Sequence, residues 1–166
     1  MPGVSPYESL QIQSVLQHDA KRPIEEGVGL FMMPGGGDEG KTLFDAAVLP
    51  AMRKNGMNRV GVRQVFHDAS VLADVCRHVQ AAEVIVVDLA DLNPSVMYVL
   101  GLCHALGRCP ILLTRDANQL PFNLGALRYV EYKPGASGMF QLRERLERTL
   151  RVFLSASRSA PAAAAE

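Results

Sequence analysis

The sequence predicts an α/β fold: a doubly wound, mostly parallel sheet of about five strands, flanked by helices on both faces. Short apolar runs typical of buried strands alternate along the chain with longer segments whose apolar residues recur at helical spacing. The clearest run is EVIVVD at residues 83–88, where four apolar residues stand between charged ones. The chain has 166 residues, a length that suits one domain with its own core.

The predicted elements follow one another in a regular order. The first strand is predicted at residues 27–33, where the run GVGLFMM is closed by Pro34 and three glycines. A helix follows at 41–54, and Asn55-Gly56 supplies its end. The remaining predictions are strands at 59–67, 83–88, 109–114 and 127–132, and helices at 71–81, 94–106 and 139–154. This order indicates a flavodoxin-like or Rossmann-like sheet, in which ligands bind beyond the carboxyl ends of the strands.

The two ends of the chain fall outside the predicted domain, which we assign to residues 27–155. Residues 1–26 are predicted to form an N-terminal arm or helix, because apolar residues recur loosely at helical spacing between Pro6 and Lys21. The last residues, SASRSAPAAAAE, are of low complexity and predict a disordered tail at 156–166.

Composition limits the classes of partner. Seventeen basic residues balance seventeen acidic ones, so we expect no nucleic-acid partner. No stretch reaches the ~18 apolar residues of a membrane span, and the N-terminus lacks the apolar region of a secretory signal. Cys76, Cys103 and Cys109 form no CxxC pair and are interpreted as buried, reduced thiols of a cytoplasmic protein. We predict neither a metal site nor a bound cofactor.

A glycine-rich segment, GGGDEGKT at residues 35–42, satisfies the G-x-x-x-x-G-K-[ST] pattern of a phosphate-binding loop. In such a loop Lys41 would reach the terminal phosphates and the Thr42 hydroxyl would hold Mg²⁺. Asp38 and Glu39, however, would put two negative charges inside the phosphate cradle. We therefore interpret the segment as a flexible turn, and a P-loop NTPase stays an alternative.

The turn after the clearest strand carries the main candidate residues. Asn93 suits the N-cap of the following helix, and Pro94 suits its first position. Asp88 and Asp91 then project into the crevice at the ends of the strands. The helix that follows is apolar on nearly all sides, which predicts burial against the sheet or against another subunit. Within it, His104 is interpreted as a packed histidine.

The same stretch resembles the nucleoside 2-deoxyribosyltransferase-like superfamily, which includes nucleotide N-glycosidases and TIR-like nucleotide-binding proteins. The strongest likeness is AAEVIVVDLADLNPSVMYVLGLCHALGRCPILLT, with its acidic turn and Asn-Pro-x-Val. Weaker likenesses occur in the expected order: GLFMMPGGG, LFDAAVLPAMRKNGM and LPFNLGALRYVEY. Together they extend from about Gly27 to Tyr132.

The resemblance implies a site for a nucleoside, a nucleotide or an NAD-like molecule, and a homodimer. Asp88 and Asp91 would hold the ribose hydroxyls. Phe122 would stack on the base, although the residue also suits a plug of the core. The ligand-binding residues implied are Met33, Pro34, Gly35, Gly36, Asp88, Asp91, Asn93, Ser95 and Phe122.

One departure concerns the family's chemistry. Where active members read Tyr-Glu-Leu-Gly, this chain reads Tyr98-Val99-Leu100-Gly101. A valine cannot attack the anomeric carbon or accept a proton. We therefore expect a nucleotide-binding protein on a silent or impaired N-glycosidase scaffold. Two further alternatives are an active N-glycosidase or deoxyribosyltransferase that uses Asp88 or Asp91, and an oligomeric scaffold.

Overall fold

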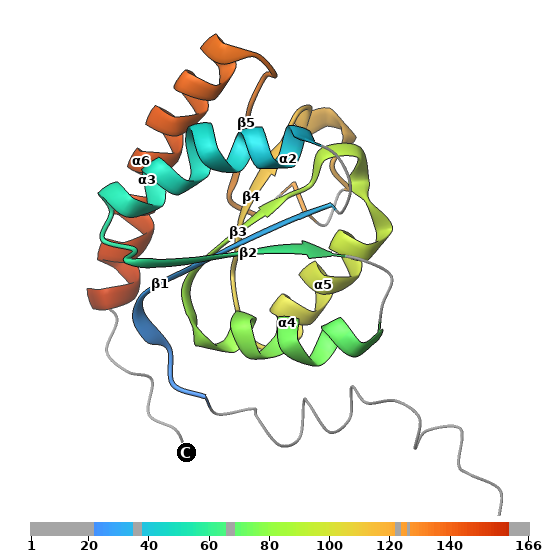
Figure 1. Ribbon diagram of the computed structural model, residues 1–166, viewed down its shortest axis with the longest axis vertical. Coiled ribbons are helices and arrows are strands. Elements are labelled where there is room, and N and C mark those ends of the chain that lie inside the picture. The colour runs from blue at the N-terminus through green and yellow to red at the C-terminus, as the bar shows by residue number, and fades with distance from the viewer. Residues whose placement is uncertain (1–21, 35–37, 66–68, 122–123, 126, 160–166) are drawn as a thin grey trace, which may run out of the picture.

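A computed structural model of the chain describes residues 22–34, 38–65, 69–121, 124–125 and 127–159, with only the backbone at 63–65 and 69–73. Its centre is a five-stranded sheet in the order β2-β1-β3-β4-β5, and every pair of neighbours is parallel (Figure 1). The predicted doubly wound α/β fold of the flavodoxin-like type is therefore confirmed. The strands are β1 Glu25–Pro34, β2 Arg59–Val65, β3 Ala82–Asp88, β4 Ile111–Thr114 and β5 Tyr129–Glu131.

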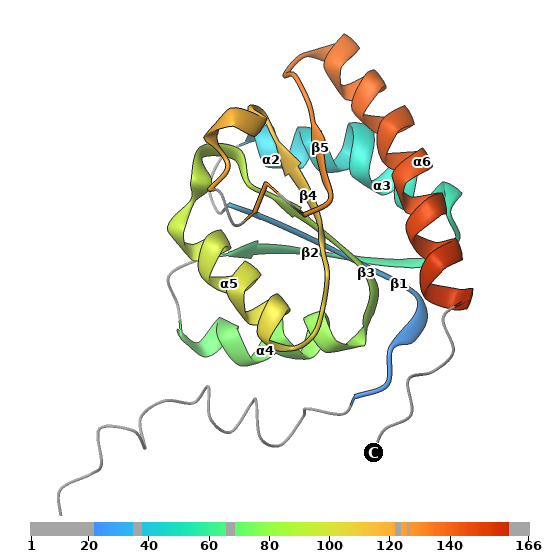
Figure 2. The same cartoon turned by 180° about the vertical axis from the view of Figure 1, so that it is seen from behind.

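Helices cover both faces of the sheet (Figures 1 and 2). One face carries α6 and a continuous helical segment in which a π-helical turn, η1, joins α2 to α3. The other face carries α4 and α5. The bounds are α2 Asp38–Leu43, η1 Phe44–Val48, α3 Leu49–Lys54, α4 Ala69–Ala81, α5 Pro94–Ala105 and α6 Ala136–Ser159, with short 3-10 turns η2 Ala90–Leu92 and η3 Ala117–Gln119.

Each helical layer packs its own core against the sheet. On the first face, Phe31 and Met33 of β1 lie against Leu43 and Met52, with four leucines of α6. On the second face, Leu30 and Met32 lie against α4 and α5. Successive residues of β1 thus point to opposite cores, because side chains alternate along a strand. A continuous apolar run such as GLFMM is what a strand buried on both faces requires.

The helix ends follow the predicted capping chemistry. The Asn93 side-chain oxygen accepts hydrogen bonds from the amides of Ser95 at 3.0 Å and Val96 at 3.3 Å, and Pro94 opens α5. Asn55 ends α3, and Gly56 follows with φ of +87°. Several bounds differ from the prediction by two or more residues: β1, α2, α4 and α6 begin earlier, β4 and β5 begin later, and α6 keeps residues 156–159 helical. The arm before residue 22 lies outside the described residues.

Two burial predictions for side chains were wrong. His104 is exposed rather than packed, because it lies on the outer side of α5. Cys109 is also exposed, since it precedes β4, whereas Cys76 and Cys103 are buried as predicted. The helix α5 is not covered all round either: Tyr98 is 50% exposed and Gly101 faces open space. Among the described residues, no helix is long and apolar enough to cross a membrane.

Two helical glycines make a matched pair of tests. A Cβ atom built on Gly138 would lie 1.9 Å from the backbone carbonyl oxygen of Lys133, whereas one on Gly101 would meet nothing within 4 Å. We expect Gly138→Ala to lower the free energy of unfolding by roughly 2–4 kcal/mol, since the clash is with backbone. Gly101→Ala should raise it by about 0.5–1 kcal/mol. Urea unfolding of both variants checks this, and equal effects would contradict it.

Candidate functional site

Three polar side chains meet where neighbouring strands end. Asp88 is the last residue of β3, Arg115 directly follows β4, and Tyr132 directly follows β5. Parallel strands end at the same edge of a sheet, so three residues distant in sequence are brought together there. The amide of Tyr132 donates to the carbonyl oxygen of Thr114 at 2.9 Å, which fixes the end of β5 beside β4.

The Asp88 carboxylate is buried and only half satisfied by the protein. Asp88 is only 3% exposed. The oxygen Oδ1 accepts from the Ala90 amide at 3.1 Å and from the Tyr132 hydroxyl at 3.2 Å. The second oxygen, Oδ2, has no partner among the described residues. Burial raises the pKa of Asp88 to about 6, against the opposing effects of both donors and of the Arg115 charge.

Tyr132 and Arg115 are the donors of the site. Burial raises the pKa of the Tyr132 phenol, and the Asp88 charge raises it further, so the hydroxyl stays protonated. The Tyr132 hydroxyl and Glu39 raise the pKa of the Arg115 guanidinium. Glu39 Oε2 lies 2.5 Å from Arg115 Nη2, and Asp91 Oδ1 lies 4.0 Å from Nη1. Arg115 thus connects the start of α2 with the ends of β3 and β5.

These residues line a cavity of about 620 Å³ between α2 and α6. Its volume lies within the range of small-molecule sites, roughly 300–1,000 Å³. The sheet side contributes the three strand-end residues. The remaining walls are Asp38, Glu39, Thr42, Leu43 and Ala46 from the α2 side, and Pro134, Gly135, Ala136, Met139, Phe140 and Arg143 from the α6 side.

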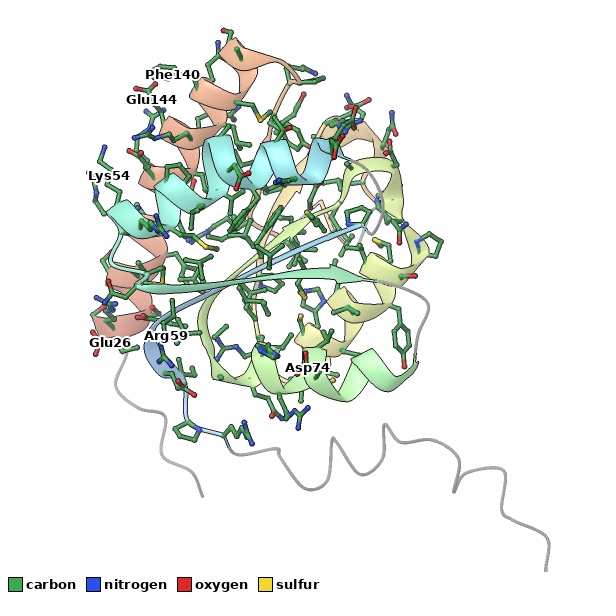
Figure 3. The ribbon with its side chains drawn as sticks, in the orientation of Figure 1. Glu26, Lys54, Arg59, Asp74, Phe140 and Glu144 are labelled. Carbon is green, nitrogen blue, oxygen red and sulfur yellow. The ribbon has the colours of Figure 1, made fainter. Side chains whose placement is uncertain are left out.

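An aromatic ring stands at the α6 wall of this cavity. Phe140 is 61% exposed although it lines the cavity, and Figure 3 shows it near the N-terminal end of α6. Its neighbour Met139 is buried in the core beneath. An exposed phenyl ring beside a cavity is available for stacking on a flat ligand.

No family model matches the chain, and no curated protein matches it. Among solved structures, the chain is similar to the rubredoxin oxygen:oxidoreductase (ROO) from the anaerobe Desulfovibrio gigas, with a TM-score of 0.57 and 13% sequence identity. The match covers 80% of this chain and 38% of that one, so the chain spans well under half of that protein. At this identity the likeness concerns the fold alone, and it agrees with the doubly wound sheet.

The predicted site residues have different locations in the structure. Asp88 lines the cavity, as expected. Asp91 is exposed, with φ of +60° in the turn η2, and reaches the site through its 4.0 Å approach to Arg115. Asn93 and Ser95 belong to the start of α5 and do not line the cavity. Met33 is in the core, and Pro34 ends β1 outside the cavity lining. Gly35, Gly36 and Phe122 lie outside the described residues.

Val99 does not form a wall of this cavity. It is 2% exposed and belongs to the core between the sheet and α5, with Leu30, Leu89 and Leu100. The position at which the resembled family has its glutamate therefore does not face the cavity around Asp88, because the helix turns it toward the sheet.

The glycine-rich segment does not have the geometry of a phosphate loop in its described part. The helix α2 already begins at Asp38, so Gly40 and Lys41 are helical. Lys41 is exposed and does not line the cavity, whereas Thr42 does. The lysine that would reach the terminal phosphates and the hydroxyl that would hold Mg²⁺ therefore face different surroundings, which disfavours the P-loop alternative.

Sequence reasoning missed four members of the site: Glu39, Arg115, Tyr132 and Phe140. For Arg115 and Tyr132 a signal existed. Arg115 is the first residue after the predicted strand at 109–114, Tyr132 is the last residue of the predicted strand at 127–132, and ligands of this fold bind where strands end. The role of Phe140 depends on how α6 docks against α2, and nothing local in the sequence carries that information.

Proposed function

We propose that this chain is a nucleoside- or nucleotide-binding protein that does not cleave its ligand efficiently and acts as a cytoplasmic homodimer. The observation that carries the proposal is the Asp88 carboxylate. It is buried at a strand end beside the cavity, it is held through Oδ1, and its Oδ2 accepts no hydrogen bond from the part of the chain that the structure describes. A fixed acceptor of this kind suits the hydroxyl groups of a sugar, which donate hydrogen bonds.

The rest of the cavity supports a ligand with a flat apolar part. Its volume is that of a small-molecule site, and half of the residues that line it are apolar or glycine. In the proposed arrangement the ribose hydroxyls donate to Asp88, and the base stacks on Phe140 instead of on Phe122. The sequence resemblance to nucleotide N-glycosidases supports the same ligand class. The homodimer would use the exposed side of α5 around Tyr98 and Gly101.

The expected lack of efficient cleavage rests on the sequence resemblance: at the position where that family has its glutamate this chain has Val99, which faces the core rather than the cavity. One observation favours a second candidate, an N-glycosidase that uses Asp88. A carboxyl group with a pKa of about 6 in a cavity can exchange a proton near neutral pH, as a general acid must. Asp91 is exposed beyond the cavity and is less suited to that role.

The test is calorimetric titration with nucleosides, nucleoside monophosphates and NAD, while chromatography follows free base in the same samples and light scattering gives the solution mass. We expect binding of at least one ligand without base release. Phe140→Ala should weaken binding roughly 5- to 150-fold, since stacking of a base contributes about 1–3 kcal/mol. Val152→Ala is the matched control, because Val152 is also on α6, is 58% exposed and lies off the cavity.

Absence of binding at millimolar concentrations of every ligand would refute the proposal. Base release in proportion to protein, lost in Asp88→Asn, would establish the enzyme instead. If Phe140→Ala and Val152→Ala weakened binding equally, the ligand would not contact the ring.

A further inference from the structure

The guanidinium of Arg115 is incompletely used by the protein. Glu39 accepts from Nη2 at 2.5 Å, and Asp91 approaches Nη1 at 4.0 Å. The third nitrogen, Nε, is excluded from solvent and has no hydrogen-bond partner in the described part of the chain. A buried N–H without an acceptor is costly, so an acceptor that reached it would stabilise the site.

The unused nitrogen and the one bound by Glu39 belong to the same edge of the guanidinium. Nε–H and Nη2–H point in parallel and form the fork that accepts two oxygens of one phosphate or carboxylate. Glu39 therefore occupies one half of a two-pronged donor, on a residue that lines the cavity.

Glu39 is also weakly held. Its side chain is 80% exposed, on the first turn of α2, and Arg115 is its ion-pair partner among the described residues. An ion pair between partly exposed groups contributes about 0–1 kcal/mol, because water competes for both partners. A ligand oxyanion that makes two hydrogen bonds can displace it at little cost.

We propose that Arg115 binds a phosphate group of the ligand. The Glu39 carboxylate occupies part of this phosphate position on the guanidinium until the ligand displaces it. The inference rests on the proposed function, because it concerns the same cavity. It makes the preferred ligand a phosphorylated nucleoside, with the sugar at Asp88 and the phosphate at Arg115. Glu39 then lowers the affinity for anionic ligands, because its carboxylate pairs with Arg115 until a ligand displaces it.

The experiment compares wild type, Glu39→Gln and Asp38→Asn by calorimetry with a nucleoside, its 5′-monophosphate and inorganic phosphate, at constant ionic strength set with chloride. Glu39→Gln should raise the affinity for the monophosphate about 10-fold, while the affinity for the nucleoside changes less than about 2-fold. Asp38 lines the same cavity without an ion pair to Arg115 among the described residues. Asp38→Asn removes an equal charge and should raise the monophosphate affinity by no more than roughly 2- to 3-fold.

Equal gains in the two variants would overturn the inference, because general relief of negative charge would then explain both. An unchanged ratio of monophosphate to nucleoside affinity in Glu39→Gln would overturn it as well. If no nucleoside binds, the proposed function fails, and inorganic phosphate still decides the inference. Binding of phosphate to Glu39→Gln that is lost in the Glu39→Gln, Arg115→Gln double variant supports the phosphate site, and no binding to Glu39→Gln at tens of millimolar phosphate refutes it.

Discussion

Replacing Asp88 by asparagine should stabilise the fold at neutral pH while abolishing ligand binding. The pKa of Asp88 is raised from its ordinary value of 3.8 to about 6. Between these two values the folded protein keeps a proton that the unfolded chain has released, so the free energy of unfolding falls as the pH rises through this window. Above pH 6 the contribution of protonated Asp88 to the free energy of unfolding is lost completely. At 1.36 kcal/mol per pKa unit, this contribution is roughly 3 kcal/mol at most.

Asparagine resembles the protonated aspartate in shape, and its Oδ1 can still accept from the Ala90 amide and the Tyr132 hydroxyl. Asp88→Asn should therefore raise the free energy of unfolding by about 1–3 kcal/mol at pH 8, and the two proteins should converge near pH 4. Urea unfolding from pH 4 to pH 8 measures this. In wild type, ligand affinity should decline as the pH falls below about 6, because the carboxylate becomes protonated.

Asp45→Asn is the matched control, because Asp45 is an exposed aspartate of η1 away from the cavity lining. We expect it to change the free energy of unfolding by less than about 0.5 kcal/mol at either pH. A less stable Asp88→Asn at pH 8 would contradict the prediction, since the charged carboxylate would then hold the structure together. A stabilised variant that no longer binds would show a site maintained at the expense of stability.

Local features of the sequence predicted the fold well. Buried strands produce apolar runs that are visible in a short window, as EVIVVD and GLFMM show. Caps such as Asn93-Pro94 and Asn55-Gly56 act on the nearest amides and so depend on neighbours in the sequence. Bounds were less exact where tertiary contacts decide them: α6 begins three residues early at Ala136, with Gly138 packed against the Lys133 carbonyl.

The candidate site was predicted only in part, because it is assembled from distant segments. Asp88 was recognised from its position at the end of a strong strand. Its partners Tyr132 and Arg115 come from the two following strands, and their proximity depends on the order of β3, β4 and β5 in the sheet. Glu39 was interpreted as an obstacle to phosphate binding within a loop, whereas its distance to Arg115 makes it a partner of the cation instead.

Val99→Glu, which introduces the glutamate of the family that the sequence resembles, should destabilise the protein by about 3–5 kcal/mol at pH 8, because it buries a carboxylate without a partner in an apolar core. Val99 is surrounded by Leu30, Leu89, Leu100 and other apolar side chains on the α5 face of the sheet. Burial would raise the pKa of the new glutamate, so the folded form would hold its proton to higher pH than the unfolded chain does. The destabilisation should therefore grow as the pH rises above about 4.3, the ordinary value for glutamate.

Val99→Gln separates charge from size, since glutamine has the same shape and stays neutral. The free energy of unfolding of Val99→Gln should lie close to that of Val99→Glu at pH 4. At pH 8 it should exceed that of Val99→Glu by roughly 2–3 kcal/mol. Urea unfolding at both pH values measures the difference. If Val99→Glu were instead as stable as Val99→Gln throughout and released free base from a nucleoside, position 99 would face the ligand, as the family resemblance implies. The loss of this one carboxylate would then be the reason that the scaffold binds without cleaving.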